Sequence, residues 1–160
     1  MIQKLIVASS AIFIFTSCVV MAVRYEMASM LQKEKELWRL QVEEPFQGVK
    51  NGRSSVLISN LALLEMLASD ADCAKNLVSI TFSSVTFQTS DGPKLAQLKN
   101  LESIEFYCCK NADSVIENCV EPQIHTIALD TTPISQGSID ALRKASLIDV
   151  MMNGHFIREE

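Results

Sequence analysis

Residues 75–82 read KNLVSITF and residues 99–106 read KNLESIEF, so an eight-residue phrase nearly repeats itself 24 positions later. The same apolar template returns in IHTIAL, residues 124–129, and in LIDVMM, residues 147–152, each 23 positions after the copy before it. Self-similarity at a period of about 20 to 29 residues is typical of stacked supersecondary units. The period therefore decides the predicted fold before any single motif does.

Each copy opens with a short predicted strand. The first, fourth and sixth residues are apolar, and the fourth and sixth alternate with polar neighbours, as in a strand with one buried face. These apolar positions are Leu77, Ile80, Phe82, Leu101, Ile104, Phe106, Ile124, Ile127, Leu129, Leu147, Val150 and Met152. Turn-rich residues follow, and then apolar residues at helical spacing, such as Ile139 and Leu142. Each copy thus predicts a strand, a turn and a helix.

A unit of this length cannot bury its apolar face alone. We therefore expect the four units to stack, with their strands in one parallel sheet and their helices in an outer layer. A terminal unit needs a cap, and residues 55–75 are interpreted as one helix with Ser54 or Ser55 as its N-cap. That helix is expected to cover the first strand.

The third copy, IHTIALDTTP followed by ISQGSIDALRKASLIDV, resembles the leucine-rich repeat in its 23 to 24-residue form. The residues that carry the resemblance are Thr132, Ile134, Ser135, Gln136, Ile139 and Leu142 in this copy, and Leu77, Ile80, Phe82, Phe87, Leu95 and Leu98 in the first. The second copy departs from the pattern, with Cys109, Asn111 and Cys119 where threonine, valine and leucine are expected.

The resemblance covers residues 77 to about 152. It implies an α/β leucine-rich repeat solenoid, with parallel strands on one face and helices on the other, that binds proteins on its exposed sheet. An ordinary α/β domain with coincidental spacing is the alternative.

No charged residue occurs from Leu5 to Val23. A helix over these 19 residues rises about 28 Å, close to the ~30 Å hydrocarbon thickness of a bilayer. We therefore predict an N-terminal transmembrane helix that attaches the chain to a membrane through residues 5–23. Two alternatives stay open: a cleaved secretory signal with Lys4 as its charged region, and a lipoprotein signal that ends at Cys18.

These features divide the chain into three predicted parts. Residues 1–24 are the transmembrane anchor or signal segment, residues 25–46 a juxtamembrane helix, and residues 47–160 the capped leucine-rich repeat domain, with repeats that start near residues 77, 101, 124 and 147. The juxtamembrane helix has too few heptads for a dimeric coiled coil, so we expect a stalk that ends near Pro45.

The predicted localisation is that of a single-pass membrane protein. Counting the flanking charges places the domain inside, whereas the resemblance to an export signal places it outside. We favour the exported side.

A binding surface is expected where strand residues point away from the helices. Its predicted residues are Thr81, Ser83, Glu105, Tyr107, Ala128, Asp130, Met151 and Asn153, and Ser79, Ser103, Thr126 and Asp149 complete the same face. The surface is mixed and mildly acidic, and Tyr107 and Met151 are the large adaptable contacts that protein interfaces favour. This pattern favours a non-catalytic protein interaction or scaffolding module with a protein partner. A merely solvated face is the alternative.

Four cysteines lie beyond the predicted anchor: Cys73, Cys108, Cys109 and Cys119. Cys109 and Cys119 fall on inward positions of the repeat, where a small apolar side chain suffices. Export would permit a disulfide, such as Cys109 to Cys119 or Cys73 to Cys108, and the sequence does not choose between the pairings. Because the cysteines and His125 lack the paired spacing of zinc ligands, we predict no metal and no cofactor.

The sequence contains no recognisable catalytic motif: no G-x-S-x-G elbow, phosphate-binding glycine loop or H-E-x-x-H. A net charge of −5 without a basic stripe excludes nucleic acid as the expected partner, and no small-molecule substrate is evident. Two alternatives to a binding module stay open. One is a thiol-dependent enzyme or redox protein that uses Cys108 or Cys109, and the other is a structural subunit of a larger membrane complex.

Overall fold

The computed structural model describes the backbone of residues 2–116, 119, 123–145 and 149–157, and the side chains from Val19 to His155 within these ranges. The chain forms two compact units, residues 1–39 and residues 40–160. The first unit consists of helix α1 (Ile2–Trp38) and Arg39, where a short π-helical segment, η1 (Arg39–Glu43), begins.

Helix α1 corrects the prediction of a transmembrane anchor. Where its side chains are described, only the five residues from Val19 to Val23 precede Arg24, and charged residues such as Glu26 and Lys33 follow. No helix among the described residues is long and apolar enough to cross a membrane. The predicted membrane attachment through residues 5–23, and with it the single-pass localisation, is therefore wrong, and residues 5–18 of that predicted span lie outside the described side chains.

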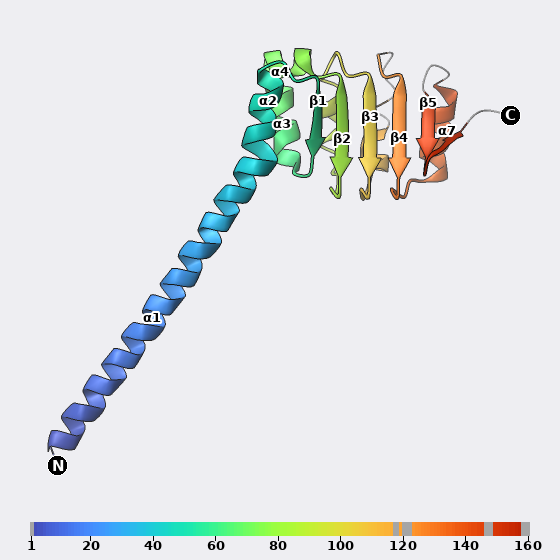
Figure 1. The fold of residues 1–160 in the computed structure, drawn as a ribbon. Helices are drawn as coiled ribbons and strands as arrows, with labels where there is room; N and C mark the ends of the chain where they lie inside the picture. Colours follow the sequence, from blue (N-terminus) through green and yellow to red (C-terminus); the bar gives the residue numbers. More distant parts are fainter. Residues whose placement is uncertain (1, 117–118, 120–122, 146–148, 158–160) are drawn as a thin grey trace. The chain divides into compact units, whose positions relative to one another are not determined.

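The second unit is built on one sheet of six strands in sequence order (Figure 1). The strands are β1 (Ser55–Ile58), β2 (Ser79–Ser83), β3 (Ser103–Tyr107), β4 (Thr126–Asp130), β5 (Asp149–Met152) and β6 (His155–Ile157). The first five are parallel, and β6 returns antiparallel to β5. The predicted α/β class is confirmed.

The apolar positions of the repeated phrase stand side by side in this sheet. Ile80 pairs in register with Ile104, Ile104 with Ile127, and Ile127 with Val150. All four side chains are buried. In the next column the Phe82 and Phe106 rings stack with centroids 5.6 Å apart, and Phe87 meets both edge-on. Such aromatic contacts add about 0.5–1.5 kcal/mol each beyond the area they bury. The duplicated phrase is therefore a duplicated strand.

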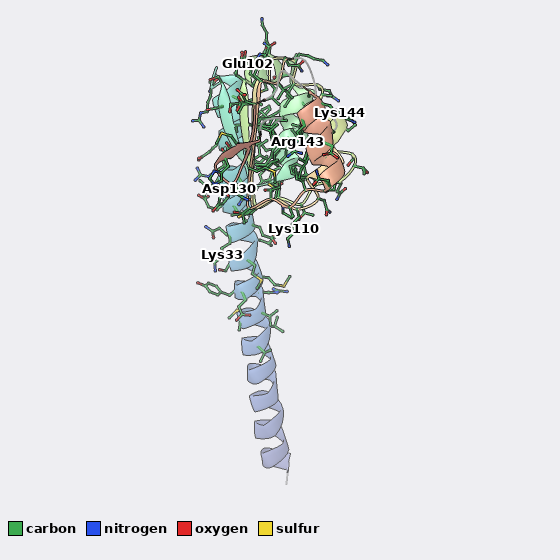
Figure 2. The ribbon with its side chains drawn as sticks, turned by 90° about the vertical axis from the view of Figure 1, so that its right-hand side faces the viewer. Lys33, Glu102, Lys110, Asp130, Arg143 and Lys144 are labelled. Carbon is green, nitrogen blue, oxygen red and sulfur yellow. The ribbon has the colours of Figure 1, made fainter. Side chains whose placement is uncertain are left out.

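The connecting segments correct the predicted solenoid. Helices lie on one side of the sheet (Figure 2), but α5 (Gly92–Leu95) has only four residues, and the described part of α6 (Asp113–Ile116) has four. Among the residues that the structure describes after β2, only α7 (Gln136–Lys144), with nine residues, resembles the helix expected in every copy. The structure is an α/β fold with a five-stranded parallel sheet and an antiparallel edge strand, rather than the uniform strand-turn-helix solenoid predicted. Leu147, the predicted start of the fourth copy, lies outside the described residues.

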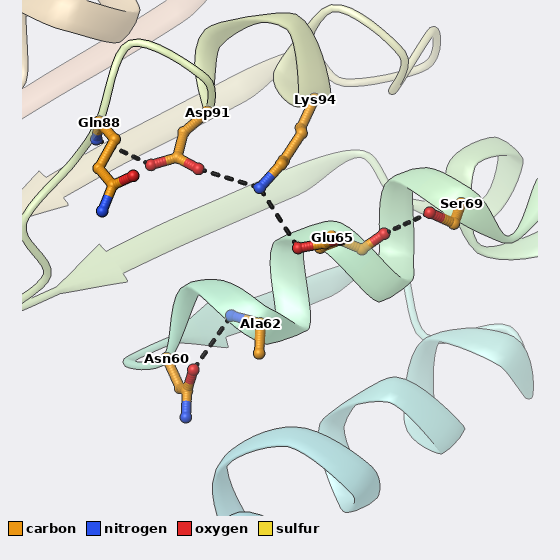
Figure 3. Close-up of polar contacts among 7 residues, drawn as sticks. All are labelled: Asn60, Ala62, Glu65, Ser69, Gln88, Asp91 and Lys94. Carbon is orange, nitrogen blue, oxygen red and sulfur yellow. Dashed lines mark hydrogen bonds and ion pairs between the residues drawn. The ribbon is translucent and has the colours of Figure 1, made fainter.

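The predicted capping helix over residues 55–75 is also wrong. Val56 and Ile58 are buried and alternate with exposed neighbours, so this stretch forms β1 and pairs with β2. Two helices follow it, α3 (Leu61–Ser69) and α4 (Ala71–Asn76). The N-cap of α3 is Asn60, whose side-chain oxygen accepts a hydrogen bond from the Ala62 N–H, rather than Ser54 or Ser55 (Figure 3).

Another helix covers the β1 end of the sheet. Pro45, the expected stop, lies in the first turn of α2 (Glu44–Lys50), where a missing N–H costs nothing. Val49 on this helix is completely buried, and its carbonyl accepts a hydrogen bond from Asn76 Nδ2 of α4. The chain therefore continues as a helix past Pro45 to close the apolar core.

A buried carboxylate ties the first connection to α3. Asp91 is 3% exposed and accepts hydrogen bonds from the Gln88 N–H at 2.9 Å and from Lys94 Nζ at 3.2 Å (Figure 3). Lys94 Nζ also lies 3.4 Å from Glu65 Oε2 on α3. Burial by itself lowers the pKa of Lys94, but the hydrogen bonds and negative charges of Asp91 and Glu65 together more than offset it, so the pKa is raised. The amine therefore stays charged between the two carboxylates.

Candidate binding surface

The side chains of β1 to β5 that point away from the helices form three rows across the strands, here called the outward face. The register places Ser55, Ser79, Ser103, Thr126 and Asp149 in the first row, Leu57, Thr81, Glu105, Ala128 and Met151 in the second, and Ser83, Tyr107 and Asp130 in the third. Neighbouring strands lie about 5 Å apart, so each row is a line of adjacent side chains.

The predicted site residues fall into two of these rows, with one exception. Thr81, Glu105, Ala128 and Met151 lie side by side in the second row, and Ser83, Tyr107 and Asp130 lie side by side in the third. Asn153 belongs to no row, because it begins the turn between β5 and β6. Its Oδ1 accepts a hydrogen bond of 3.0 Å from the Thr131 N–H, so this side chain supports the end of the sheet.

Two large side chains stand exposed on the outward face. Tyr107 is 46% exposed, as its position in the strand pattern predicts, and Leu57 is 57% exposed. Leu57 was missed because residues 55–75 were interpreted as one helix. The signal for a strand there was that Val56 and Ile58, two β-branched residues, stand 24 positions before Ile80 and Phe82, at the spacing of the repeat.

The outward face is acidic. Its charged residues are Glu105, Asp130 and Asp149, and none of its outward positions on β1 to β5 carries a basic residue. Basic side chains lie elsewhere, for example Arg143 and Lys144 on α7, whereas Asp130 lies on the sheet side (Figure 2). The field above the sheet therefore favours cations.

Hydroxyl groups orient two of the carboxylates. Thr81 Oγ1 donates a hydrogen bond of 3.0 Å to Glu105 Oε2, and Thr131 Oγ1 donates one of 3.0 Å to Asp130 Oδ1. A neutral hydroxyl fixes the direction of a carboxylate without neutralising its charge. Each of the two carboxylates thus has one oxygen outside these contacts.

No cysteine belongs to the three rows of the outward face. The cysteines whose side chains the structure describes, Cys73, Cys108, Cys109 and Cys119, are free thiols. Cys73, Cys109 and Cys119 are buried, as expected for core filling at Cys109 and Cys119. Burial raises the pKa of Cys73 to about 11 and that of Cys119 to about 12, and it also raises the pKa of Cys109. A thiol with a raised pKa holds little of the reactive thiolate at neutral pH. The disulfides that export would permit are not formed.

Within the ranges that the structure describes, no group of three or more His, Cys, Asp or Glu side chains is arranged to hold a metal ion. The candidate site is thus the open outward face.

The comparisons with known proteins add no relative: no family model, no curated protein and no solved structure matches this chain. The class that the geometry defines is an α/β domain with one exposed sheet face. The resemblance to leucine-rich repeat proteins stays a prediction.

Proposed function

We propose that this chain is a non-catalytic protein interaction module that binds a protein partner with its outward face. The observation that carries the proposal is the register, because it brings side chains from strands 23 or 24 residues apart into continuous rows. A rigid sheet presents such rows with little loss of conformational entropy on binding. The exposed Tyr107 supplies the kind of aromatic anchor around which protein interfaces are built.

The thiol chemistry considered from the sequence for Cys108 or Cys109 has less support at Cys109. Cys109 is buried, with its Sγ 3.5 Å from the Phe82 carbonyl oxygen and 3.4 Å from the Tyr107 carbonyl oxygen. A nucleophilic cysteine needs access to its substrate and a lowered pKa, and burial raises the pKa of Cys109. We therefore propose binding and not catalysis.

Site-specific photo-cross-linking in the cells that make the protein tests the proposal. The variant Tyr107→p-benzoylphenylalanine places the reactive group on the outward face, and Lys144→p-benzoylphenylalanine places it on α7 at the opposite side as the control. We expect discrete covalent adducts with another protein at position 107 and none of the same size at position 144. Absence of adducts at position 107, or identical adducts at both positions, would contradict the proposal.

A further inference from the structure

We propose that the outward face recognises its partner through an arginine side chain of that partner, seated on Tyr107 between Glu105 and Asp130; this inference rests on the function proposed above. These three residues are here called the acidic cradle.

The geometry of the sheet brings the acidic cradle together. Tyr107 on β3 and Asp130 on β4 are direct register partners, which places their backbones about 5 Å apart. Glu105 lies two residues before Tyr107 on β3, about 7 Å away on the same face. Tyr107 and Glu105 are exposed, and Asp130 is half-buried. One extended cationic side chain can therefore contact all three.

The charges of the acidic cradle are not neutralised by the chain itself. The described contacts of both carboxylates are to hydroxyls, Thr81 for Glu105 and Thr131 for Asp130. Neither carboxylate takes part in an ion pair within the described part of the chain. A neutral or acidic partner would bury these carboxylates without pairing them, and the lost hydration would weaken binding. A cationic partner would pair them.

The chemistry of the acidic cradle favours arginine over lysine. A guanidinium is planar, so it can lie against an exposed tyrosine ring while its edge donates to carboxylates on both sides. A lysine ammonium is a compact charge that stays strongly hydrated and has no flat surface for the ring. The combination of one exposed aromatic ring with two flanking carboxylates is thus matched to arginine.

A defined peptide series tests this inference on the full chain. The probes are three nine-residue peptides in which serine alternates with arginine, lysine or glutamate, titrated into ¹⁵N-labelled protein at low and at high ionic strength. We expect the arginine peptide to bind most tightly and to shift the amide signals of residues 105–107 and 128–130. Its affinity should decrease at high ionic strength, because salt screens the charges.

Variants of the acidic cradle separate specific recognition from general attraction. The pair Glu105→Gln and Asp130→Asn should weaken binding of the arginine peptide about tenfold, and Tyr107→Leu about two- to fivefold. The control pair Glu102→Gln and Asp140→Asn also removes two negative charges, but outside the acidic cradle. It should change the affinity for the arginine peptide less than twofold.

Two results would overturn the inference: equal losses in the cradle and control variants, or no preference of the protein for the arginine peptide over the others. If adducts form at position 107 while the arginine peptide does not bind, the partner is a protein of other chemistry and only this inference fails. If no adducts form at position 107 and the arginine peptide does not bind, both this inference and the proposed binding function are wrong.

Discussion

At the scale of single residues, Cys109 and Thr132 occupy the same place in successive units. Thr132 Oγ1 lies 3.0 Å from the Phe106 carbonyl oxygen on the preceding strand and accepts a hydrogen bond of 3.1 Å from the Cys109 N–H. Cys109 Sγ makes the corresponding contact of 3.5 Å with the Phe82 carbonyl oxygen one unit earlier. The cysteine is therefore a weak substitute for the threonine and needs no redox role to explain it.

We predict that Thr132→Val lowers the free energy of unfolding by about 1–3 kcal/mol, because it leaves the Phe106 carbonyl and the Cys109 N–H buried without this partner. Cys109→Thr should keep or raise the stability, since a hydroxyl is the stronger donor. Urea denaturation measures both. Wild-type stability in Thr132→Val would show that the hydroxyl is not a structural link.

Asp70 predicts how stability depends on pH. Its carboxylate accepts a hydrogen bond of 2.8 Å from Lys50 Nζ and caps α4 through the Asp72 and Cys73 N–H groups. The hydrogen bond from Lys50, together with the Cys73 N–H, lowers the pKa of Asp70 from 3.8 to about 2. A lowered folded-state pKa means that the stabilisation is present above the unfolded value and is lost as pH falls through the folded value.

We therefore expect the midpoint temperature of thermal unfolding to decrease as the pH is lowered from about 4 to about 2. This decrease should be less steep in Asp70→Asn. Asparagine keeps an oxygen for the cap but has no proton to gain. Thermal melts across this range measure the difference. Parallel curves for the two proteins would exclude Asp70 as a source of the acid sensitivity.

At the scale of elements, the β5–β6 hairpin ends the sheet, and the sequence contains a signal for its turn. Asn153 and Gly154 both have positive φ, 48° and 80°, and they connect Met152 directly to His155. Asn-Gly between apolar residues is a strong hairpin signal. The strand was missed because only repeats of the 23-residue template were sought there.

Gly154→Ala should lower the free energy of unfolding by about 1–2 kcal/mol. A Cβ there would meet no atom within 4 Å, so the cost comes only from the left-handed backbone. Gly137→Ala on α7 is the matched control: its Cβ would contact only Ser135 Oγ at 3.7 Å, so stability should stay equal or rise by up to about 1 kcal/mol. Chemical denaturation of both variants measures the contrast, and equal effects would contradict this account of the turn.

The elements that the sequence predicted well are those with strict two-residue alternation. Ile104 and Phe106 illustrate this, because each sits between residues that remain outside the core. β1 was missed because SVLI is followed at once by the apolar run LALLEML, and one long helix explained both. Packing separates them, since Val56 and Ile58 pair with β2 while Leu63, Leu64 and Leu67 face the core from α3.

At the scale of the whole molecule, alternation also explains how much of the candidate site was predictable. Glu105, Tyr107 and Asp130 were placed on one face by the period of two alone, and the register aligns them. What alternation does not provide is the contact that each makes, such as the hydroxyl bonded to Glu105. The prediction of the anchor rested on the length of an uncharged run, and it was wrong because no helix in the described part of the chain is long and apolar enough to cross a membrane.

The arrangement of the outward face depends on this register as a whole. A slip of one residue between two parallel strands turns every side chain of the shifted strand to the opposite face. Slippage of β3 would bury Glu105 and Tyr107 and expose Ile104 and Phe106, which removes both the core column and the acidic cradle. The fold and the proposed function therefore both depend on the same register of the parallel strands.

The most direct measurement is the set of cross-strand nuclear Overhauser contacts in the isotopically labelled protein. We predict contacts that join Ile80 to Ile104, Ile104 to Ile127 and Ile127 to Val150 as direct neighbours in parallel strands. Contacts offset by one residue, or antiparallel contacts among these strands, would contradict the account.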